Sequence, residues 1–519
     1  MDHIEPKFLS QIRRGIEKES LRVSPDGNLS TLTHPIALGS PLTHSNITTD
    51  FSEAQLELIT DTHQNLEACL QQLKDVHHFV YQNLGPELLW CSSMPCSLPR
   101  DDLIPIATYG SSNIAKAKTT YRRGLAVRYG RTMQTISGIH YNFSLPSEYW
   151  TDTDEDLNTE KIRRNEAYFG LIRNFRRYAW LLLYLFGASP AVCQCFVEGR
   201  VHQLKALSKN TRYLPYATSL RMGPLGYQSD VQSSISVSYN NLGDYSSSLF
   251  DALTKPFPPY SAIGLKNRDG EYQQLSTSLL QIENEFYGTI RPKQPVQLGE
   301  RPLHALNSRG VEYVEVRCID IDPYSPIGIN EETSAFIDTF LLYCMLSLSP
   351  KDTPEENKTN GRNQYLIAER GREPGIKLIR GNEYIAMKDW GKEIIDRCVP
   401  LAEQLDYANK TTRHTSAIES AREKLNIPNA TPSGKILHEL QEKFNGSYFD
   451  FVMDLSSKYA SDAHNKERCI EPHTDMQLDA QMSLERQRQI ESTDQISFDE
   501  FRETYISQEA SRIYLTQKN

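Results

Sequence analysis

The 519-residue chain lacks the features that mark a membrane or secreted protein. Its longest apolar run, Trp180–Phe186, is far shorter than the roughly 20 residues that span a bilayer. The N-terminal stretch shows no charged region followed by an apolar segment and a cleavage site, so we expect no secretory signal. The sequence therefore predicts a cytoplasmic protein that does not associate with membranes.

An excess of positive charge is also missing. The formal net charge is −10 and the isoelectric point is about 5.8. Nucleic-acid backbones require a basic surface, so we expect no nucleic-acid partner. A composition of 39% hydrophobic and 24% charged residues is that of an ordinary globular protein, and the length allows more than one lobe.

Paired cysteine motifs are absent as well. No CxxC pair indicates a zinc site, and an odd number of irregularly spaced cysteines does not resemble a disulfide framework. A reduced, cytosolic set of thiols is the simplest interpretation, although a redox or structural role for one pair stays open. The nine cysteines are Cys69, Cys91, Cys96, Cys193, Cys195, Cys318, Cys344, Cys398 and Cys469.

No glycine-rich phosphate loop occurs: neither GxxxxGK[ST] nor GxGxxG is present, and the metal motif HExxH is missing too. A nucleotide site in this chain would therefore have to hold phosphates through metal ions and through Arg and Lys side chains. The guanidinium fork suits that task.

What the chain does contain is an unusual strand at Gly310–Pro326 (GVEYVEVRCIDIDPYSP). Alternation places Glu315 and Arg317 on one face with apolar neighbours. Buried charges are costly unless they pair or bind a charged ligand. This stretch alone leaves two interpretations open, an internal ion pair or a functional site.

Further strands bring additional acidic residues. Ser10–Val23 carries Glu17 and Glu19, Thr48–Thr60 carries Asp50 and Glu57, and Thr132–Leu145 carries His140. Carboxylates and a histidine on facing strands suit a hard cation such as Mg²⁺. Each residue taken singly also fits an interpretation without function, as a solvent-exposed carboxylate or as a buried histidine with hydrogen-bond partners.

The remaining chain divides by composition. We expect a catalytic part over 1–350, a linker or loop region over 351–390, whose polar start is Lys351–Asn363, and a helical C-terminal region over 391–519 packed on the catalytic part. Apolar periodicity predicts helices. They cover Asn65–Leu84, Lys161–Gly187, Glu332–Leu348, Lys392–Tyr407, Lys435–Phe444, Tyr448–Tyr459, Gln477–Glu491 and Phe498–Leu515.

Several long stretches, in order, resemble one known family. They read RRGIEKESLRV, THSNITTDFSEAQLELIT, MQTISGIHYNFSLP, YLFGASPAVC, YLPYATSLRMGPLGY, QIENEFYGTIRPK and GVEYVEVRCIDIDPYSPIG. Together they are similar to the gamma-proteobacterial type of glutamate–cysteine ligase, densely from about residue 10 to 330. The resemblance implies an α+β fold whose curved antiparallel sheet forms a cup, as in glutamine synthetase, with helices outside. The stretch before Arg13 is short for this family, so we expect its N-terminal helix to be absent or trimmed.

The resemblance also implies a reaction. ATP phosphorylates the gamma-carboxylate of L-glutamate, and the amine of L-cysteine displaces phosphate to give gamma-glutamylcysteine, the first step of glutathione biosynthesis. Phosphoryl transfer gathers negative charge that metal ions and arginine must neutralise. Mg²⁺ is the implied cofactor, which Mn²⁺ can replace, and the substrates are small molecules; we expect a monomer.

Roles follow from the resemblance position by position. The implied Mg²⁺ ligands are Glu17, Glu19, Asp50, Glu57, His140 and Glu315. Arg317 lies near the reacting gamma-carboxyl or phosphoryl group, Arg221 holds glutamate, and Arg122 lies near the triphosphate. Gln134, Ile136 and Asn142 line the neighbouring pocket. The implied cysteine pocket consists of Phe51, Tyr121, Leu125, Tyr227 and Tyr287.

Two other functions remain open. A related ATP-dependent ligase could keep the metal and phosphate site and accept another amine. A non-catalytic sensor could use the same fold, although none of the six metal-type side chains is missing. A second catalytic activity that completes glutathione is not expected, because about 130 helical residues after position 390 leave too little room for another ATP-binding domain.

Overall fold

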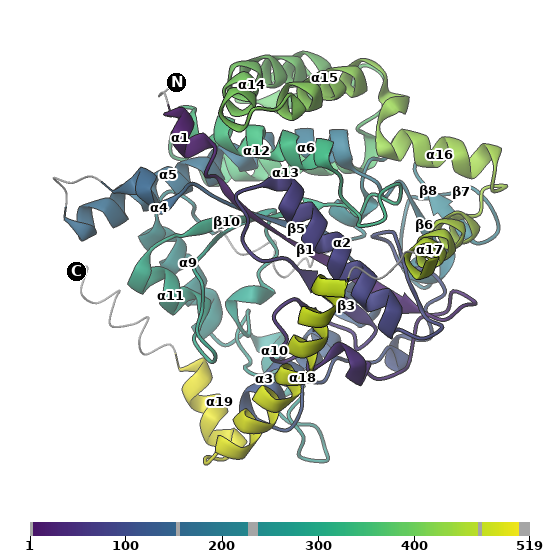
Figure 1. Cartoon of the computed structure of the whole chain (residues 1–519), viewed down its shortest axis with the longest axis vertical. Helices are drawn as coiled ribbons and strands as arrows, with labels where there is room; N and C mark the ends of the chain where they lie inside the picture. Colours follow the sequence, from purple (N-terminus) through teal and green to yellow (C-terminus); the bar gives the residue numbers. More distant parts are fainter. Residues whose placement is uncertain (1–3, 152–155, 227–236, 466–469, 508–519) are drawn as a thin grey trace.

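A computed structural model of the chain describes residues 4–151, 156–226, 237–465 and 470–507. In this part of the chain an open antiparallel sheet lies at the centre and helices surround it (Figure 1). The α+β class expected from the sequence is confirmed. The N-terminal helix α1 (Pro6–Leu9) is a single turn.

Seven strands form the central sheet in the order β2-β3-β1-β5-β10-β9, and β4 pairs with the end of β1. Every pairing in it is antiparallel. The strands are β1 (Arg13–Val23), β2 (Ile47–Thr49), β3 (Gln55–Ile59), β4 (Leu88–Leu89), β5 (Ile139–Ser144), β9 (Ile290–Lys293) and β10 (Tyr313–Ile319). The longest, β1, therefore connects both halves of the sheet.

The two faces of this sheet differ sharply in chemistry. On β10, Val314 and Val316 enter the hydrophobic core, whereas the alternate residues Glu315 and Arg317 face a pocket. On β5, Tyr141 likewise belongs to the core. A bulge between Val316 and Ile319 shifts the pairing of β10 with β5, and Ile319 packs in the core. The alternation that places Glu315 and Arg317 on one face thus ends at Arg317.

Helices cover the apolar face. The long α12 (Glu331–Leu346) is buried along most of its length and packs against α5 (Leu157–Tyr178), α14 (Met387–Asn409) and α15 (Arg413–Asn426). Its start is fixed by Asn330, whose side chain accepts from the backbone N–H of Thr333. The expected helix Asn65–Leu84 is α2 (Leu66–Asn83), and Lys161–Gly187 divides into α5 and α6 (Trp180–Phe186).

The other helices and strands lie around the central sheet and its covering helices (Figure 1). The helices are α3 (Asn113–Tyr129), α4 (Ser147–Trp150), α7 (Gln194–Val197), α9 (Leu242–Thr254), α10 (Pro258–Ile263), α11 (Pro302–Arg309), α13 (Pro354–Arg370), α16 (Pro432–Glu442), α17 (Tyr448–Asn465), α18 (Ile470–Thr493) and α19 (Phe498–Ile506). A small sheet has the order β6 (Ala191–Cys193), β8 (Thr211–Tyr213) and β7 (Lys205–Ala206). A hairpin joins β11 (Lys377–Arg380) and β12 (Glu383–Ala386).

Three expectations about local structure were wrong. Thr48–Thr60, expected as one strand, is the antiparallel pair β2 and β3, and Asp50 lies in the turn between them. The segment 351–390, expected as a linker, contains α13 and the hairpin β11–β12. Thr353 caps α13 by accepting from the N–H of Glu356, and Pro354 occupies the first turn, so the polar run is the first part of a helix. Thr132–Leu145 is also not one strand, because a 3₁₀ turn at Thr132–Thr135 precedes β5.

The C-terminal helices return to elements of the N-terminal part, because α18 packs against α2 and α19 packs against α3 (Figure 1). Ser483 of α18 accepts from the N–H of Ser40 at 2.8 Å, and Glu491 accepts from the N–H of Ser111, also at 2.8 Å. Arg502 of α19 donates to the carbonyl of Leu275 at 2.7 Å. The expected helix Phe498–Leu515 is described up to Ile506, and residues 508–519 lie outside the described part.

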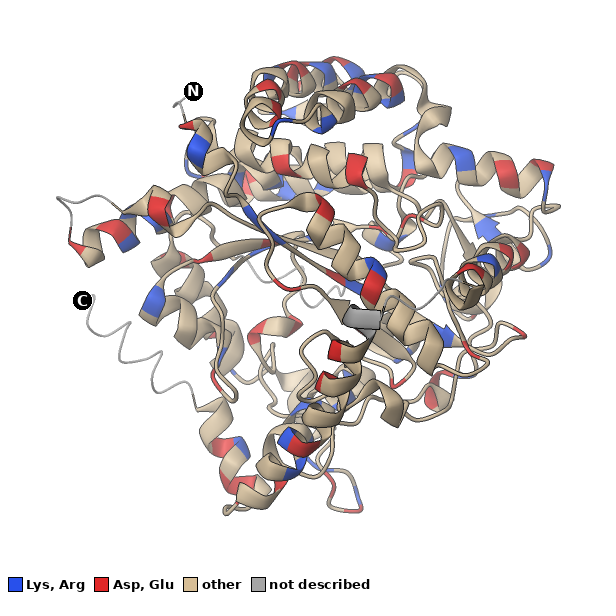
Figure 2. Cartoon of the chain, in the orientation of Figure 1, with Lys and Arg blue, Asp and Glu red and all other residues tan. Residues whose placement is uncertain are grey.

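The outer helices carry charges of both signs (Figure 2). Arg422 of α15, for example, pairs with Asp396 of α14 at 2.8 Å, and both side chains are exposed. Such surface pairs contribute at most about 1 kcal/mol. Across the described ranges, no helix combines the length and the apolar character that crossing a membrane requires.

A buried ion pair ties the sheet to the helix behind it. Arg14 Nε of β1 lies 3.1 Å from Asp338 Oδ2 of α12, and both side chains are almost fully buried. The Tyr141 hydroxyl donates to Asp338 Oδ1 at 2.8 Å. Burial opposes the charge on Arg14, yet Asp338 and Tyr141 raise the pKa of this guanidinium. The pair therefore holds β1, β5 and α12 in register.

We expect Asp338→Ala to lower the free energy of unfolding by about 3–5 kcal/mol, because it leaves the buried Arg14 charge without its partner. Urea unfolding monitored by circular dichroism measures the change. The matched control is Asp251→Ala, which removes the exposed pair with Lys255 and should cost less than about 1 kcal/mol. Equal losses in the two variants would contradict a special role for the buried pair.

Candidate active site

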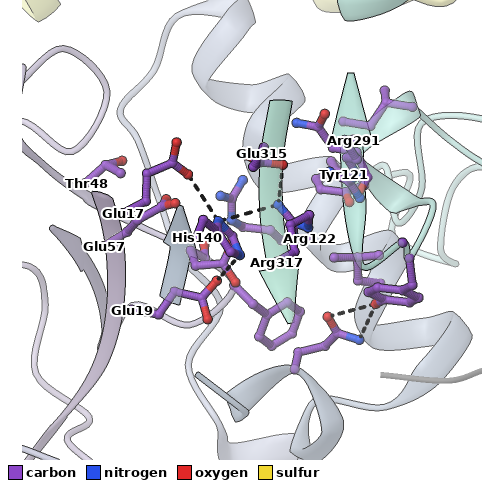
Figure 3. A pocket seen from close by; sticks show the side chains of 18 of the residues that line it. Glu17, Glu19, Thr48, Glu57, Tyr121, Arg122, His140, Arg291, Glu315 and Arg317 are labelled. Atoms are coloured by element: carbon purple, nitrogen blue, oxygen red, sulfur yellow. Dashed lines mark hydrogen bonds and ion pairs between the residues drawn. The ribbon is translucent and has the colours of Figure 1, made fainter. Parts of the chain in front are cut away.

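The polar face of the sheet forms one wall of a pocket of about 360 Å³ (Figure 3). Strands β1, β3, β5, β9 and β10 supply charged side chains to it, and α3 supplies the opposite wall. The acidic, basic and histidine residues that the strands supply to the pocket are Glu17, Glu19, Glu57, His140, Arg291, Lys293, Glu315 and Arg317.

His140 lies between two glutamates of the neighbouring strand. Its Nδ1 is 3.1 Å from Glu17 Oε2, and its Nε2 is 3.6 Å from Glu19 Oε1. Register explains this arrangement, because Glu17 pairs with His140 across β1 and β5, and Glu19 pairs with Glu57 across β1 and β3. Gly138 donates its backbone N–H to Glu19 Oε2 at 2.7 Å, which fixes the second glutamate.

Two basic side chains form ion pairs with Glu315. Lys293 Nζ lies 3.0 Å from Oε1, and Arg317 Nη1 lies 3.0 Å from Oε2. The Glu315 side chain is 1% exposed, whereas the Arg317 side chain is 22% exposed. The guanidinium therefore pairs with Glu315 on one side and still faces the open pocket. The ion pair expected for this strand is present, and both of its members line the pocket.

The carboxyl groups differ in their proton affinity. Burial and then the neighbouring Asp50 raise the pKa of Glu19 to about 8. Burial together with Glu17, Asp50 and Glu19 raises the pKa of Glu57 well above its ordinary value. Burial opposes ionisation of Glu315 too, but Lys293 and Arg317 hold its pKa well below the ordinary range. One end of the pocket thus has more carboxylate charge than its own cations neutralise.

A divalent cation fits this end. Glu17, His140 and Glu315 each offer a ligand atom, and these atoms lie within 4.8 Å of one another. Oxygen ligands with one imidazole suit a hard cation, and the raised pKa values of Glu19 and Glu57 show where further positive charge would be stabilising. Asp50 lines the same pocket. These residues fit Mg²⁺ or Mn²⁺ better than a soft metal.

Arg221 forms a second charged group in the wall. Its guanidinium donates to the carbonyl of Arg317 at 2.9 Å and lies 3.5 Å from Asp320 Oδ1. A glycine at position 138 makes room for it, since a Cβ there would lie 2.0 Å from Arg221 Nη2. The side chain is only 2% exposed, so this arginine is held rigidly at the pocket surface.

Helix α3 adds further cations at the other side. Arg122 donates to the backbone carbonyls of Asp50 and Thr49, and its guanidinium lies 4.6 Å from the centre of the Tyr109 ring. Lys118, one turn earlier, lies over the same ring, and burial lowers its pKa to about 8. This group of cations suits a polyanion such as a triphosphate.

Aromatic side chains close the remaining part of the pocket. Gln134 Nε2 donates to the Tyr287 hydroxyl at 3.1 Å, and burial raises the pKa of Tyr121 well above its ordinary value, so the phenol stays neutral. Phe51 and Leu125 complete this wall. A small compartment with aromatic walls suits a small, uncharged side chain.

Most of the residues expected from the sequence meet in this one pocket. They are Glu17, Glu19, Asp50, Phe51, Glu57, Tyr121, Arg122, Leu125, Gln134, His140, Arg221, Tyr287, Glu315 and Arg317. Ile136 and Asn142 do not line it: Ile136 is fully buried, and Asn142 donates to Glu17 Oε1 at 2.8 Å from the side. Tyr227 lies outside the described residues.

Sequence reasoning missed several lining residues, among them three cations and a tyrosine. Arg291 and Lys293 belong to β9, and their spacing of two would have placed both on the pocket face. Lys118 precedes Arg122 by one helical turn, which is also a readable signal. Tyr505 gives no such signal, because it reaches the pocket from α19 near the other end of the chain.

Comparison with known proteins identifies one family. A family model described as glutamate-cysteine ligase matches residues 1–367. A glutamate–cysteine ligase of Pseudomonas entomophila (strain L48) is 46% identical over 497 residues, 95% of this chain and 93% of the relative. One of Bordetella bronchiseptica is 45% identical over 503 residues, 96% of this chain and 94% of the relative.

Solved structures match as well. A crystal structure of glutamate–cysteine ligase from Francisella tularensis in complex with AMP superimposes with a TM-score of 0.90 at 35% identity, covering 97% of this chain and 99% of that one. A bifunctional glutathione synthetase from Pasteurella multocida has a TM-score of 0.70 at 26% identity, covering 89% of this chain and 54% of that one.

We expect the affinity for Mg²⁺ in the absence of nucleotide to rise between about pH 6.5 and 8. Below the Glu19 pKa of about 8 the carboxyl holds a proton that the cation must displace, and above it the carboxylate is already free. One displaced proton gives up to about a tenfold change per pH unit. Isothermal titration calorimetry at several pH values measures it.

The Glu19→Gln variant is the matched control, because it keeps the size of the side chain and removes the titrating group. Its Mg²⁺ affinity should be weaker and should depend less on pH. An affinity of the unchanged protein that stays constant over this pH interval would contradict the expected competition between proton and cation.

Proposed function

The chain belongs to the glutamate–cysteine ligase family, and from this premise we propose how its pocket divides the work of the reaction. It is an ATP-dependent ligase of glutathione biosynthesis, which joins the gamma-carboxylate of L-glutamate to the amine of L-cysteine. The observation that carries the assignment of roles is that a carboxylate cluster, an arginine facing the cavity and an aromatic wall meet in one pocket.

The metal-binding end consists of the acidic residues on the strands together with His140. We assign Mg²⁺ to this end, with Mn²⁺ as a substitute; bound there, it would neutralise phosphate charge and orient the transferred group. The residues that would hold it are Glu17, Glu19, Asp50, Glu57, His140 and Glu315. Asn142 supports this set from behind, because it fixes Glu17 through a hydrogen bond.

Arg317 is assigned to the reacting centre. A gamma-carboxylate oxygen of glutamate attacks the terminal phosphorus of ATP, and ADP leaves; the cysteine amine then attacks the acyl carbon, and phosphate leaves. Negative charge grows on the transferred group in the first step, and a guanidinium already fixed by Glu315 can stabilise it without reorientation.

The other walls bind the substrates. Arg221 is assigned to a carboxylate of glutamate, for which its rigid position is an advantage. Arg122 and Lys118 are assigned to the triphosphate. The cysteine side chain is assigned to the aromatic compartment formed by Phe51, Tyr121, Leu125 and Tyr287, and Tyr227 belongs to the same proposed set. Gln134 orients Tyr287, and Ile136 buttresses this wall from the core.

The division of the chain also belongs to this proposal. Residues 1–350 supply the catalytic sheet and residues 391–519 pack on it, whereas 351–390 form a helix and a hairpin between them. We further propose a monomer in the cytoplasm. Light scattering coupled to size exclusion tests the first point, and fractionation of cells tests the second.

Steady-state phosphate release tests the function. With Mg²⁺ and ATP, release should require L-glutamate and L-cysteine together, and omission of either should abolish turnover. Mass spectrometry should find gamma-glutamylcysteine in amounts equal to the phosphate released. Turnover with other amines and none with cysteine would instead support a ligase of different specificity.

We expect Arg317→Ala to lower kcat by at least ~10²-fold, as for the loss of one donor that stabilises transition-state charge. Circular dichroism and the midpoint of thermal unfolding establish whether the variant is folded. The matched control is Arg362→Ala, an exposed residue on α13, which should leave kcat unchanged. Near-normal turnover of a folded Arg317→Ala variant would return Arg317 to a purely structural role.

A further inference from the structure

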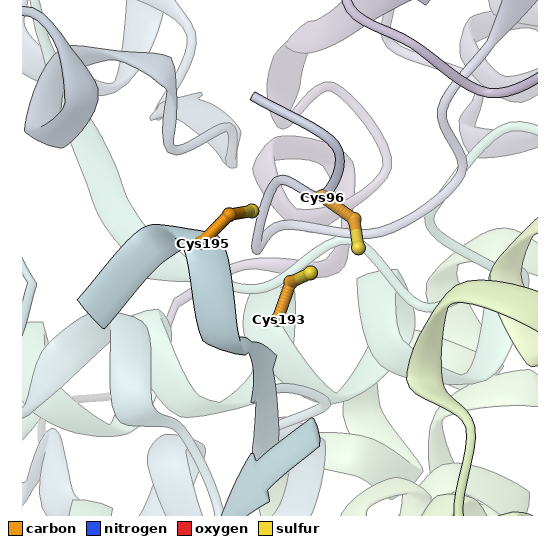
Figure 4. Close-up of side chains that lie close together, drawn as sticks. All are labelled: Cys96, Cys193 and Cys195. Carbon is orange, nitrogen blue, oxygen red and sulfur yellow. The ribbon is translucent and has the colours of Figure 1, made fainter. Parts of the chain in front are cut away.

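Three cysteines from two distant segments of the chain meet outside the carboxylate pocket (Figure 4). Cys96 lies in the loop after β4, Cys193 ends β6, and Cys195 lies in the short helix α7. Their three sulfur atoms lie within 4.8 Å of one another. All three are free thiols; Cys96 and Cys193 are buried, and Cys195 is partly accessible.

The surrounding structure holds these positions. Cys193 pairs with Thr211 across β6 and β8. The loop that carries Cys96 is fixed at Met94, whose carbonyl accepts from the Trp90 indole at 2.8 Å and from the Tyr448 hydroxyl at 2.9 Å. The three sulfur atoms are therefore placed by packed elements and not by a mobile surface loop.

The group lies in an apolar part of the core. Cys96 and Cys193 belong to the same hydrophobic cluster as Phe196 and Val197, and Cys195 packs against this cluster. Ser97, which follows Cys96, adopts a left-handed backbone conformation with φ of 47°. A metal ion bound between the three sulfur atoms would displace the protons of the thiols that become its ligands.

We propose that Cys96, Cys193 and Cys195 form a binding site for one thiophilic, three-coordinate metal ion, namely Cu(I). The set offers three sulfur donors and no oxygen or nitrogen, and soft thiolates select Cu(I) over the hard cations of the catalytic pocket. A structural zinc site normally has four protein ligands, one more than this set provides. Binding releases the proton of each thiol that becomes a thiolate ligand.

A bound ion would connect the loop that carries Cys96 to β6 and α7, which carry Cys193 and Cys195. The loop with Cys96 also supports the catalytic sheet, because Ser93 accepts the backbone N–H of Ser137 at 3.0 Å through its carbonyl and that of Ile321 at 2.8 Å through its hydroxyl. Ser137 is next to Gly138, which holds Glu19 and faces Arg221. The metal would therefore fasten β6 and α7 to the back of the active-site wall.

The experiment uses the full-length, reduced protein under anaerobic conditions, with Cu(I) titrated against a chromophoric Cu(I) chelator. We expect one tightly bound Cu(I) per chain and a thiolate-to-metal absorption band. X-ray absorption should show three sulfur neighbours at about 2.3 Å, by analogy with the zinc–thiolate distance. Loading should also raise the midpoint of thermal unfolding.

Variants decide whether this site is the one occupied. Cys195→Ser should weaken the competed affinity by at least about 100-fold, since even residues behind a ligand cost up to that much. It should also abolish the thermal shift. Cys398→Ala, which removes a buried thiol of α14 outside the cluster, should leave both unchanged. Cys96→Ala provides a second ligand variant if Cys195→Ser fails to fold.

Several results would overturn the proposal. Equal Cu(I) affinity in the unchanged protein and in Cys195→Ser and Cys96→Ala would show that copper binds elsewhere. The site would be of a different kind if competition showed tighter binding of Zn²⁺ than of Cu(I), and if the X-ray absorption spectrum of the zinc-loaded protein showed a nitrogen or oxygen ligand. A disulfide between two of these cysteines that forms in place of metal binding would make the cluster a redox pair.

Discussion

The structure depends on placing mutually repelling carboxylates on one face of a sheet whose other face is a hydrophobic core. Alternation along β10 shows how this is possible, because Glu315 faces the pocket whereas its neighbours Val314 and Val316 belong to the hydrophobic core. The repulsion is only partly neutralised from within, by Lys293 and Arg317 at Glu315. Burial and the neighbouring carboxylates, whose charge these two cations do not neutralise, raise the pKa values of Glu19 and Glu57. Metal ions that bind in this pocket together with phosphate groups would complete its charge balance.

Such a face needs a rigid support, and buried polar contacts behind the sheet provide it. Arg14 and Asp338 connect β1 to α12, and Tyr141 adds β5 to the same network. On the pocket side, Asp320 fixes Arg221, and Gly138 allows its close approach. Electrostatic stabilisation of a transition state is effective only when the charged groups are already in place. The polar network in the core and the arrangement at the site therefore serve the same requirement.

Residue spacing predicted part of this arrangement, and the family resemblance implied the other site residues. The limits of prediction have physical causes. Period-two alternation identified Glu17, Glu19, Glu315 and Arg317, since a strand has only two faces. The same rule failed at Thr132–Leu145, where a 3₁₀ turn precedes β5, and beyond Arg317, where a bulge shifts the register. The polar run after Lys351 was misjudged because a solvated helix and a loop share a composition, and only the cap at Thr353 separates them. Tyr505 and the group formed by Cys96, Cys193 and Cys195 depend on contacts between distant segments, which no local pattern encodes.

The absence of a glycine-rich phosphate loop now has a structural explanation. A loop of that kind binds phosphate through backbone N–H groups at the start of a helix. Here the cations come from side chains on strands and on α3, held by backbone carbonyls, aromatic rings and carboxylates: Arg122 by Thr49 and Asp50, Lys118 by Tyr109, Arg317 by Glu315. Side-chain cations neutralise more charge than backbone dipoles do, which suits a pocket that must hold a triphosphate beside a carboxylate substrate. The acidic end then becomes necessary as well, because without it the same cations would repel each other and the metal ion that phosphoryl transfer needs would have no protein ligands.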